Sequence, residues 1–203
     1  MKEKANIAVL VSGGGTNLQA LIDARRSGII KSGEIKLVIS DNSKAYALER
    51  AANAGIDTFT VIKKECSGQA DFEQKIIDKL KEYDIDLIVL AGFMSILSEN
   101  FTSQYDKRII NVHPSLIPSF CGAGFYGLKV HEAALGKGVK VTGATVHFVN
   151  EIPDGGEIIA QKAVEVMEGD TPEVLQKRVM EQAEWIILPQ SAEKVSAEII
   201  SKN

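Results

Sequence analysis

Two polar residues interrupt the apolar stretch RIINVHPSLIPSF, which spans residues 108–120. Asn111 and His113 alternate with apolar residues, so in a β-strand both side chains lie on one face, where the strand gives way to a loop. An Asn amide can donate a hydrogen bond to an oxygen that gains negative charge, and an imidazole can donate, accept or carry a proton near neutral pH. The pair is therefore a candidate for catalysis. A buried His bonded to backbone, beside an Asn that ends the strand, would give the same pattern.

Asp154 is the candidate third member of this group. It precedes two glycines in the turn-rich sequence NEIPDGG, residues 150–156. If its carboxylate approaches His113, it would favour the charged imidazolium and hold the ring in one orientation. An Asp before two glycines is also an ordinary turn residue, and spacing alone does not decide between the two roles.

Three other reactive side chains are weaker candidates. His131 lies in a helical pattern beside Glu132, so we expect it at the surface. His147 lies in the strand-like sequence GATVHFV, which predicts a half-buried position. Cys121 follows His113 closely enough to raise a nucleophilic cysteine, but nothing near it in the sequence marks an activated thiol.

A glycine-rich loop, SGGGTNLQAL, follows the first apolar run and opens a helical pattern. Its three glycines allow a tight turn with bare amide N–H groups, and the helix N-terminus adds about half a positive charge, which suits a phosphate. The pattern is neither GxGxxG nor GxxxxGK[ST], so it does not predict a dinucleotide or nucleoside triphosphate site. A plain strand-to-helix turn, capped by Thr16 or Asn17, is the alternative.

The first half of the chain alternates apolar runs with helical patterns. Continuous rather than alternating apolar strands are buried on both faces, which predicts a parallel sheet flanked by helices. The predicted strands are 7–11, 35–40, 57–62 and 86–92, and the helices between them are 16–28, 44–55 and 69–83.

The second half changes character. We expect a fifth strand at 109–112, a short helix within 126–138, and an antiparallel pair at 141–149 and 156–166. A helix begins after Thr171, with Pro172 at its first position, and is predicted to run to about Leu188, where Pro189 interrupts or kinks it. No linker divides the chain, so we expect one domain over residues 1–203.

Composition excludes several classes of protein. With 203 residues and a net charge of −4, the chain has no overall attraction for nucleic acid or an anionic membrane surface. Its two isolated cysteines favour a reducing, cytoplasmic location. The first apolar run ends at Ser12, too early for a signal peptide, and no stretch is long enough to predict a membrane span.

Five motifs, in this order, resemble the glycinamide ribonucleotide formyltransferases of purine biosynthesis: SGGGTNLQAL, VLAGFMSILS, INVHPSLIPSF, VHFVNEIPDGG and a late Glu five residues before a Pro. The likeness covers about residues 5–190. It implies a Rossmann-like three-layer α/β sandwich, mostly parallel with an antiparallel C-terminal extension. It also implies transfer of a formyl group from the co-substrate 10-formyltetrahydrofolate to the amino group of glycinamide ribonucleotide, without a metal.

The resemblance assigns roles to the candidate residues. Residues 1–105 would form the mononucleotide-binding half, and 106–203 the catalytic and folate-binding half. Asn111, His113 and Asp154 match the catalytic trio. Glu184, five residues before Pro189, matches an acidic residue that holds the amino end of the substrate, after a one-residue shift in its helix. The residues that match the phosphate loop are Gly15, Thr16 and Asn17.

The folate contacts are where the chain departs from the family. The matching segment consists of Met94, Ser95, Ile96 and Leu97, which would line the folate pocket together with Asn111 and the backbone of residues 150–155. The family usually has Arg where this chain has Ser95 and Gln69. Both positions face the folate, so the resemblance implies that its anionic tail is held differently here.

Other readings of the same motifs remain. Formyltetrahydrofolate hydrolase and methionyl-tRNA formyltransferase share INVHPS and DGG, but each carries an extra domain that we do not expect here, because the first strand starts at residue 7. A non-catalytic module that binds a phosphorylated metabolite is the alternative from another class. The partners expected are small molecules, with the protein a monomer or a homodimer.

Overall fold

The computed structural model describes residues 2–202 and contains a seven-stranded sheet with the order β3-β2-β1-β4-β5-β6-β7. Strands β1 to β5 run parallel, and β6 and β7 continue the sheet as an antiparallel hairpin. The strands are β1 (Ala5–Val11), β2 (Gly33–Ser40), β3 (Asp57–Thr60), β4 (Leu87–Leu90), β5 (Ile109–His113), β6 (Val141–Phe148) and β7 (Ile158–Glu165). Each predicted strand is present, and no end differs from the prediction by more than two residues.

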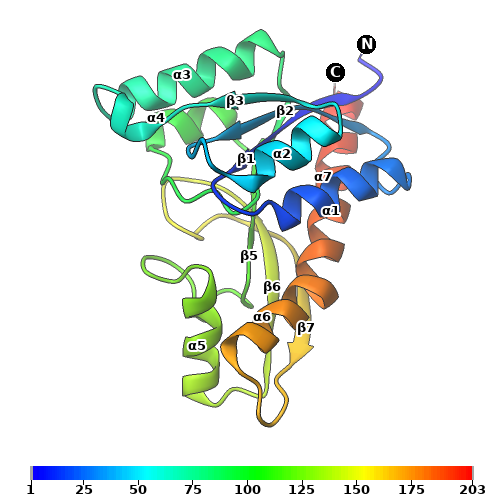
Figure 1. Cartoon of the computed structure of the whole chain (residues 1–203). Coiled ribbons are helices and arrows are strands. Elements are labelled where there is room, and N and C mark those ends of the chain that lie inside the picture. Colours follow the sequence, from blue (N-terminus) through cyan, green and yellow to red (C-terminus); the bar gives the residue numbers. More distant parts are fainter. Residues whose placement is uncertain (1, 203) are drawn as a thin grey trace.

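Helices cover both faces of the parallel part of the sheet (Figure 1). The helices of the described chain are α1 (Thr16–Arg26), α2 (Tyr46–Asn53), α3 (Gln69–Glu82), α4 (Glu99–Thr102), α5 (Leu128–Lys137), α6 (Pro172–Val179) and α7 (Trp185–Lys202), of which α5 and α6 lie beside β6 and β7. Short 3-10 turns occupy Lys63–Glu65 and Ser103–Tyr105, and a π-helical turn occupies Met180–Glu184. Within residues 2–202, no helix has both the length and the apolar composition needed to cross a bilayer.

The two faces of the sheet form two separate hydrophobic clusters. Along β1, Ile7 and Val9 pack into a cluster with α1, α2, α6 and α7, and Ala8 and Leu10 pack into a second cluster with α3 and α4. Because both sets are fully buried, β1 reads as a continuous apolar run, as the sequence predicts for a central parallel strand. The predicted three-layer α/β architecture with an antiparallel extension is confirmed.

The course of the last helix differs from the prediction. The chain does not break near Leu188: α7 continues through Pro189 to Lys202, and the irregularity lies earlier, in the π-helical turn. Trp185 has ψ −5°, far from the about −42° of a regular helix, so its carbonyl is turned aside from the Pro189 ring that would otherwise meet it. The helix start is as predicted, since Thr171 caps α6 by accepting from Val174 N.

Candidate active site

Three neighbouring strands deliver the candidate residues to one edge of the sheet. The glycine-rich loop follows β1, the 91–97 segment follows β4, and His113 ends β5, so all three lie at the carboxyl ends of adjacent parallel strands. The order β2-β1-β4 places a topological switch point beside β1, where open α/β sheets bind their ligands. Hydrogen bonds join the first two loops, from Ser12 N to Gly92 O (3.2 Å) and from Met94 N to Ser12 Oγ (2.8 Å).

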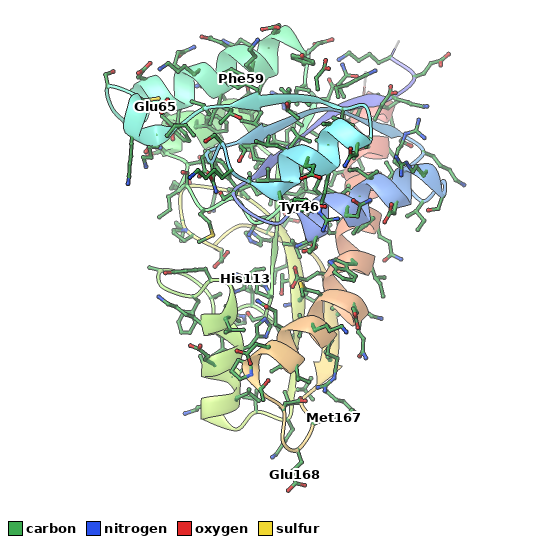
Figure 2. The ribbon with its side chains drawn as sticks, viewed as in Figure 1. Tyr46, Phe59, Glu65, His113, Met167 and Glu168 are labelled. Atoms are coloured by element: carbon green, nitrogen blue, oxygen red, sulfur yellow. The ribbon has the colours of Figure 1, made fainter. Side chains whose placement is uncertain are left out.

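Asp154 lies next to His113, although it comes from the turn between β6 and β7. Nδ1 of the buried His113 is 3.4 Å from Oδ2 of Asp154, and its Nε2 is 2.9 Å from the carbonyl oxygen of Phe120. Both neighbours are hydrogen-bond acceptors, so both contacts are satisfied together when each ring nitrogen carries a proton. Figure 2 shows His113 near the middle of the molecule, at the end of β5 that lies towards α5. The approach of Asp154 to His113, which spacing in the sequence did not decide, is therefore present in the structure.

The Asp154 carboxylate is held in its charged form by several neighbours. Burial acts to raise the pKa of Asp154, but the contact with His147, the amide of Gly122 and the charges of both histidines outweigh it and lower the pKa below its usual value. The Gly122 N–H donates to Oδ2 at 2.8 Å. Asp154 has a φ of 57°, a left-handed conformation that Asp tolerates better than most residues.

His147 belongs to the same cluster, which sequence reasoning did not assign. It is paired directly with Asn111 across the β5–β6 ladder and is buried, not half-buried as expected. Its Nε2 lies 3.2 Å from Nδ2 of Asn111 and 3.5 Å from Oδ1 of Asp154, and its Nδ1 lies 2.7 Å from the carbonyl of Phe148. His147 therefore links the two polar residues that the sequence analysis placed on separate segments.

Glu184 meets the N-terminal end of α1. Its Oε2 accepts from Nδ2 of Asn17 at 2.7 Å, and Thr16 Oγ1 lies 3.9 Å from the sulfur of Met180 in the same π-helical turn. Glu184 consequently lies beside the glycine loop. Burial raises its pKa to about 7, and the bond from Asn17 opposes that rise.

Hydrogen bonds to side chains of neighbouring segments hold the 93–98 segment in place. Ser95 Oγ donates to Asp41 Oδ2 at 2.7 Å. Gln69 donates to Oε1 of the buried Glu73 (2.5 Å) and to the carbonyl of Ile96 (3.1 Å). The two side chains expected near the folate tail are thus engaged with their own neighbours.

Two cavities meet at Asn111 and Asp154. One, of about 110 Å³, lies between the 93–97 segment and the 149–154 turn, and His147 also borders it. The other, of about 530 Å³, lies between Gly92–Ile96 and the 122–127 loop, and His113 also borders it. Of the described residues, none that borders either cavity is Lys or Arg, and Ser95 borders the smaller one whereas Gln69 borders neither.

Two other side chains can be compared with their predictions. His131 is fully buried on α5, so the predicted surface position is wrong; burial lowers its pKa to about 4, with the charge of His113 as a further cause. Within residues 2–202 neither of its ring nitrogens has a hydrogen-bond partner. Burial and the charge of Asp154 raise the pKa of the Cys121 thiol, which argues against a nucleophilic cysteine.

The sequence was compared with those of known protein families and proteins. A sequence model of the Formyl transferase family matches residues 5–191. The chain belongs to the formyl transferase family. This confirms the resemblance on which the assignment of the candidate residues depends.

Individual members of the formyl transferase family give the same picture. The phosphoribosylglycinamide formyltransferase of Escherichia coli (strain K12) is 42% identical over 87% of this chain and 81% of its own length. The trifunctional purine biosynthetic protein adenosine-3 of Homo sapiens is 44% identical over 97% of this chain, which spans only 19% of that longer protein. Among solved structures, a phosphoribosylglycinamide formyltransferase from Coxiella burnetii has a TM-score of 0.88 at 41% identity, covering 97% of this chain and 89% of its own.

Proposed function

We propose that this formyl transferase moves a formyl group from 10-formyltetrahydrofolate to the amino group of glycinamide ribonucleotide, giving formylglycinamide ribonucleotide in purine biosynthesis. The observation that carries the proposal is the cluster of Asn111, His113 and Asp154 where the two cavities meet. Support also comes from the relatives, which include phosphoribosylglycinamide formyltransferases that align over most of this chain.

The catalytic roles follow from the types of residue and their contacts. The neutral amine attacks the formyl carbon, and the formyl oxygen gains negative charge. Asn111 would donate to that oxygen through Nδ2. Protonated His113, which faces the Asp154 carboxylate, would stabilise the oxygen and deliver a proton to the folate nitrogen as the bond from that nitrogen to the formyl carbon breaks. The imidazole would then take up the proton that the attacking amine releases. With its Nδ1–H on the carbonyl of Phe148, His147 would accept from Nδ2 of Asn111 through Nε2 and so orient that amide from the facing strand.

The substrate phosphate would bind at the glycine loop. Residues 13–17 donate no backbone hydrogen bond to any other residue of the described chain, so the amides of Gly15, Thr16 and Asn17 are available to an anion. The side chain of Glu184, fixed by Asn17, lies beside this loop and would hold the amino end of the ribonucleotide.

The formyl donor would occupy the cavities at the carboxyl end of β4. The smaller cavity has apolar walls formed by Leu90, Phe93, Leu97 and Val149, a surface that suits a flat heteroaromatic ring. The exposed side chains of Met94 and Ile96 border the larger cavity, where apolar contact with the rest of the formyl donor would replace the ion pairs expected of arginines.

The remaining features of the proposal concern organisation. Residues 1–105 supply the phosphate loop and the 93–97 segment, and residues 106–203 supply the catalytic trio and Glu184, within a single domain. We place the enzyme in the cytoplasm as a monomer or homodimer that acts on small molecules and not on nucleic acid.

A direct assay tests the proposal. The protein is mixed with glycinamide ribonucleotide and 10-formyltetrahydrofolate, and release of tetrahydrofolate is followed. We expect release only when both substrates are present. Release without the ribonucleotide would indicate a formyltetrahydrofolate hydrolase, and no release in either case would indicate a binding module.

A further inference from the structure

The glycine loop is held from one side by the segment that follows β2. Three successive carbonyl oxygens of the loop accept hydrogen bonds from this segment. The pairs are Asn42 Nδ2 to Ser12 O (3.1 Å), Ala47 N to Gly13 O (3.1 Å) and Arg50 Nε to Gly14 O (2.8 Å). The carbonyls therefore point towards α2, and the loop amides are left without a partner within residues 2–202.

Packing reinforces this arrangement at Gly15. Its φ is 72°, and an added Cβ would lie 2.6 Å from Cβ of Ala47, so the start of α2 is in tight contact with the loop. Figure 2 shows Tyr46 at the start of α2, close to the end of α1 that follows the loop. The position of α2 thus determines the position of the loop backbone.

Arg50 makes the charged contact in this set and is itself fixed by several groups. Besides Gly14, its guanidinium donates through Nη1 to Oε1 of Gln19 on α1 (3.1 Å) and lies 5.0 Å from the centre of the Tyr46 ring. One planar side chain therefore joins α2, the loop and α1. Of the described residues that border the cavity of about 410 Å³ along α1, Arg50 is the one cation.

We infer that Arg50 is a positioning residue for the substrate phosphate. Arg50 holds the Gly14 carbonyl towards α2 and binds Gln19 on α1. These two bonds would keep the amides of residues 13–17 directed at the substrate phosphate. A guanidinium bonds two acceptors in fixed directions, whereas a lysine ammonium has no such fork. The inference rests on the proposed function, because it concerns the same phosphate site.

The test compares Arg50→Met and Arg50→Lys with a matched control, Arg26→Met, which removes an exposed arginine near the far end of α1. We expect Arg50→Met to raise KM for glycinamide ribonucleotide roughly tenfold or more, the scale of one lost charge-assisted hydrogen bond. Its kcat and its KM for the formyl donor are expected to change by less than about threefold, because the trio is not touched. Arg50→Lys keeps the charge but not the fork, so we expect its KM for glycinamide ribonucleotide to remain at least about threefold above that of the wild type.

Binding of inorganic phosphate separates this inference from the proposed function. Trp185 is the one tryptophan of the chain and borders the same cavity as Thr16 and Arg50, so its fluorescence can report occupancy, with calorimetry as a second readout. We expect phosphate to bind the wild type and Arg26→Met alike, and Arg50→Met more weakly by roughly the same factor as the ribonucleotide. This result needs no turnover.

Three outcomes would overturn the inference. The first is an Arg50→Met enzyme whose KM for the ribonucleotide and affinity for phosphate match the wild type. The second is a fall in kcat alone. The third is complete recovery in Arg50→Lys, which would show that charge, and not the oriented fork, matters. Thermal unfolding of each variant confirms that the proteins compared are folded; if Arg50→Met fails to fold, Arg50→Lys carries the comparison.

Discussion

Oδ2 of Asp154 lies 3.4 Å from Nδ1 of His113, so the turn between β6 and β7 supplies the carboxylate that faces the last residue of β5. The same carboxylate reaches His147 with its other oxygen, at 3.5 Å. Two histidines from neighbouring strands therefore face one half-buried carboxylate. Removing that anion affects both, which makes Asp154 the most informative position to change.

Substitution of Asp154 by Asn tests the role of this charge. Asn keeps the shape of the side chain but no longer favours the imidazolium, so we expect kcat to fall by roughly 10²–10⁴ while KM for the ribonucleotide stays within about threefold. Steady-state kinetics measure both. Asp106→Asn removes an exposed carboxylate just before β5 and is the matched control. A loss of ribonucleotide binding equal to the loss of turnover would contradict the assignment.

Substitution of Asn111 by Ala tests the proposed oxyanion donor. Its Nδ2 is lost, and no other side-chain amide borders both cavities among the described residues, so we expect kcat to fall by about 10²–10³. Single-turnover measurements at saturating substrates report the chemical step. Asn100→Ala, an exposed change on α4, is expected to leave the rate unchanged. A fall of less than about tenfold would exclude Asn111 as the principal donor.

Glu184 makes stability depend on pH in a defined direction. Its pKa of about 7 in the folded protein exceeds the ordinary value of 4.5, so the folded state keeps a proton that the unfolded state releases between these values. The unfolding free energy therefore falls as pH rises from 4.5 to 7, by roughly 2–4 kcal/mol from this group. Denaturant titrations of wild type and Glu184→Gln give the unfolding free energy of each protein at several pH values. We expect the difference between the two free energies to shrink as pH falls towards 4.5.

His131 makes stability depend on pH in the opposite direction to Glu184. The comparison with Glu184→Gln is needed to separate the two effects. The pKa of His131 is lowered from 6.5 to about 4, so the unfolded state takes up a proton first and stability is lost as pH falls through this range. The wild-type profile contains both effects, whereas the difference between wild type and Glu184→Gln removes that of His131. Identical pH profiles for the two proteins would contradict the raised pKa of Glu184.

We expect Glu73 to hold the 93–98 segment, which borders the proposed site of the formyl donor, in place. This buried carboxylate accepts from Gln69 and from both the amide (2.7 Å) and the hydroxyl (2.5 Å) of Ser98. Glu73→Ala leaves these donors unpaired, so we expect a loss of roughly 2–4 kcal/mol in unfolding free energy and a higher KM for 10-formyltetrahydrofolate. Glu82→Ala, at the exposed end of α3, is the control. If Glu73→Ala leaves KM for 10-formyltetrahydrofolate unchanged, Glu73 does not control the position of the 93–98 segment.

The sequence predicted the parts of this structure that local pattern determines. Continuous apolar strands and glycine-ended helices identified the sheet, and the alternation of Asn111 and His113 placed them on one face. His147 was not assigned because its partnership with Asn111 depends on the β5–β6 register, which no local pattern reveals. The burial of His131 did have a local signal, since it lies one helical turn before the buried Ala134.

The rest depends on contacts between distant segments. The bond from Asn17 to Glu184 joins α1 to the π-helical turn across 167 residues of the sequence. The bonds from Gln69 to the carbonyl of Ile96 and from Ser95 to Asp41 likewise join segments that are far apart in the sequence. Residue type alone therefore indicated polar side chains at these positions without indicating their partners.

Transfer of a labelled formyl group tests the central claim most directly. The protein is incubated with glycinamide ribonucleotide and 10-formyltetrahydrofolate that carries ¹³C in its formyl group, and the products are identified by mass spectrometry. We predict that the label appears in formylglycinamide ribonucleotide in equal amount to the tetrahydrofolate released, and that His113→Ala abolishes this transfer while still binding the ribonucleotide. Label found only in free formate, or transfer unchanged in His113→Ala, would contradict the account.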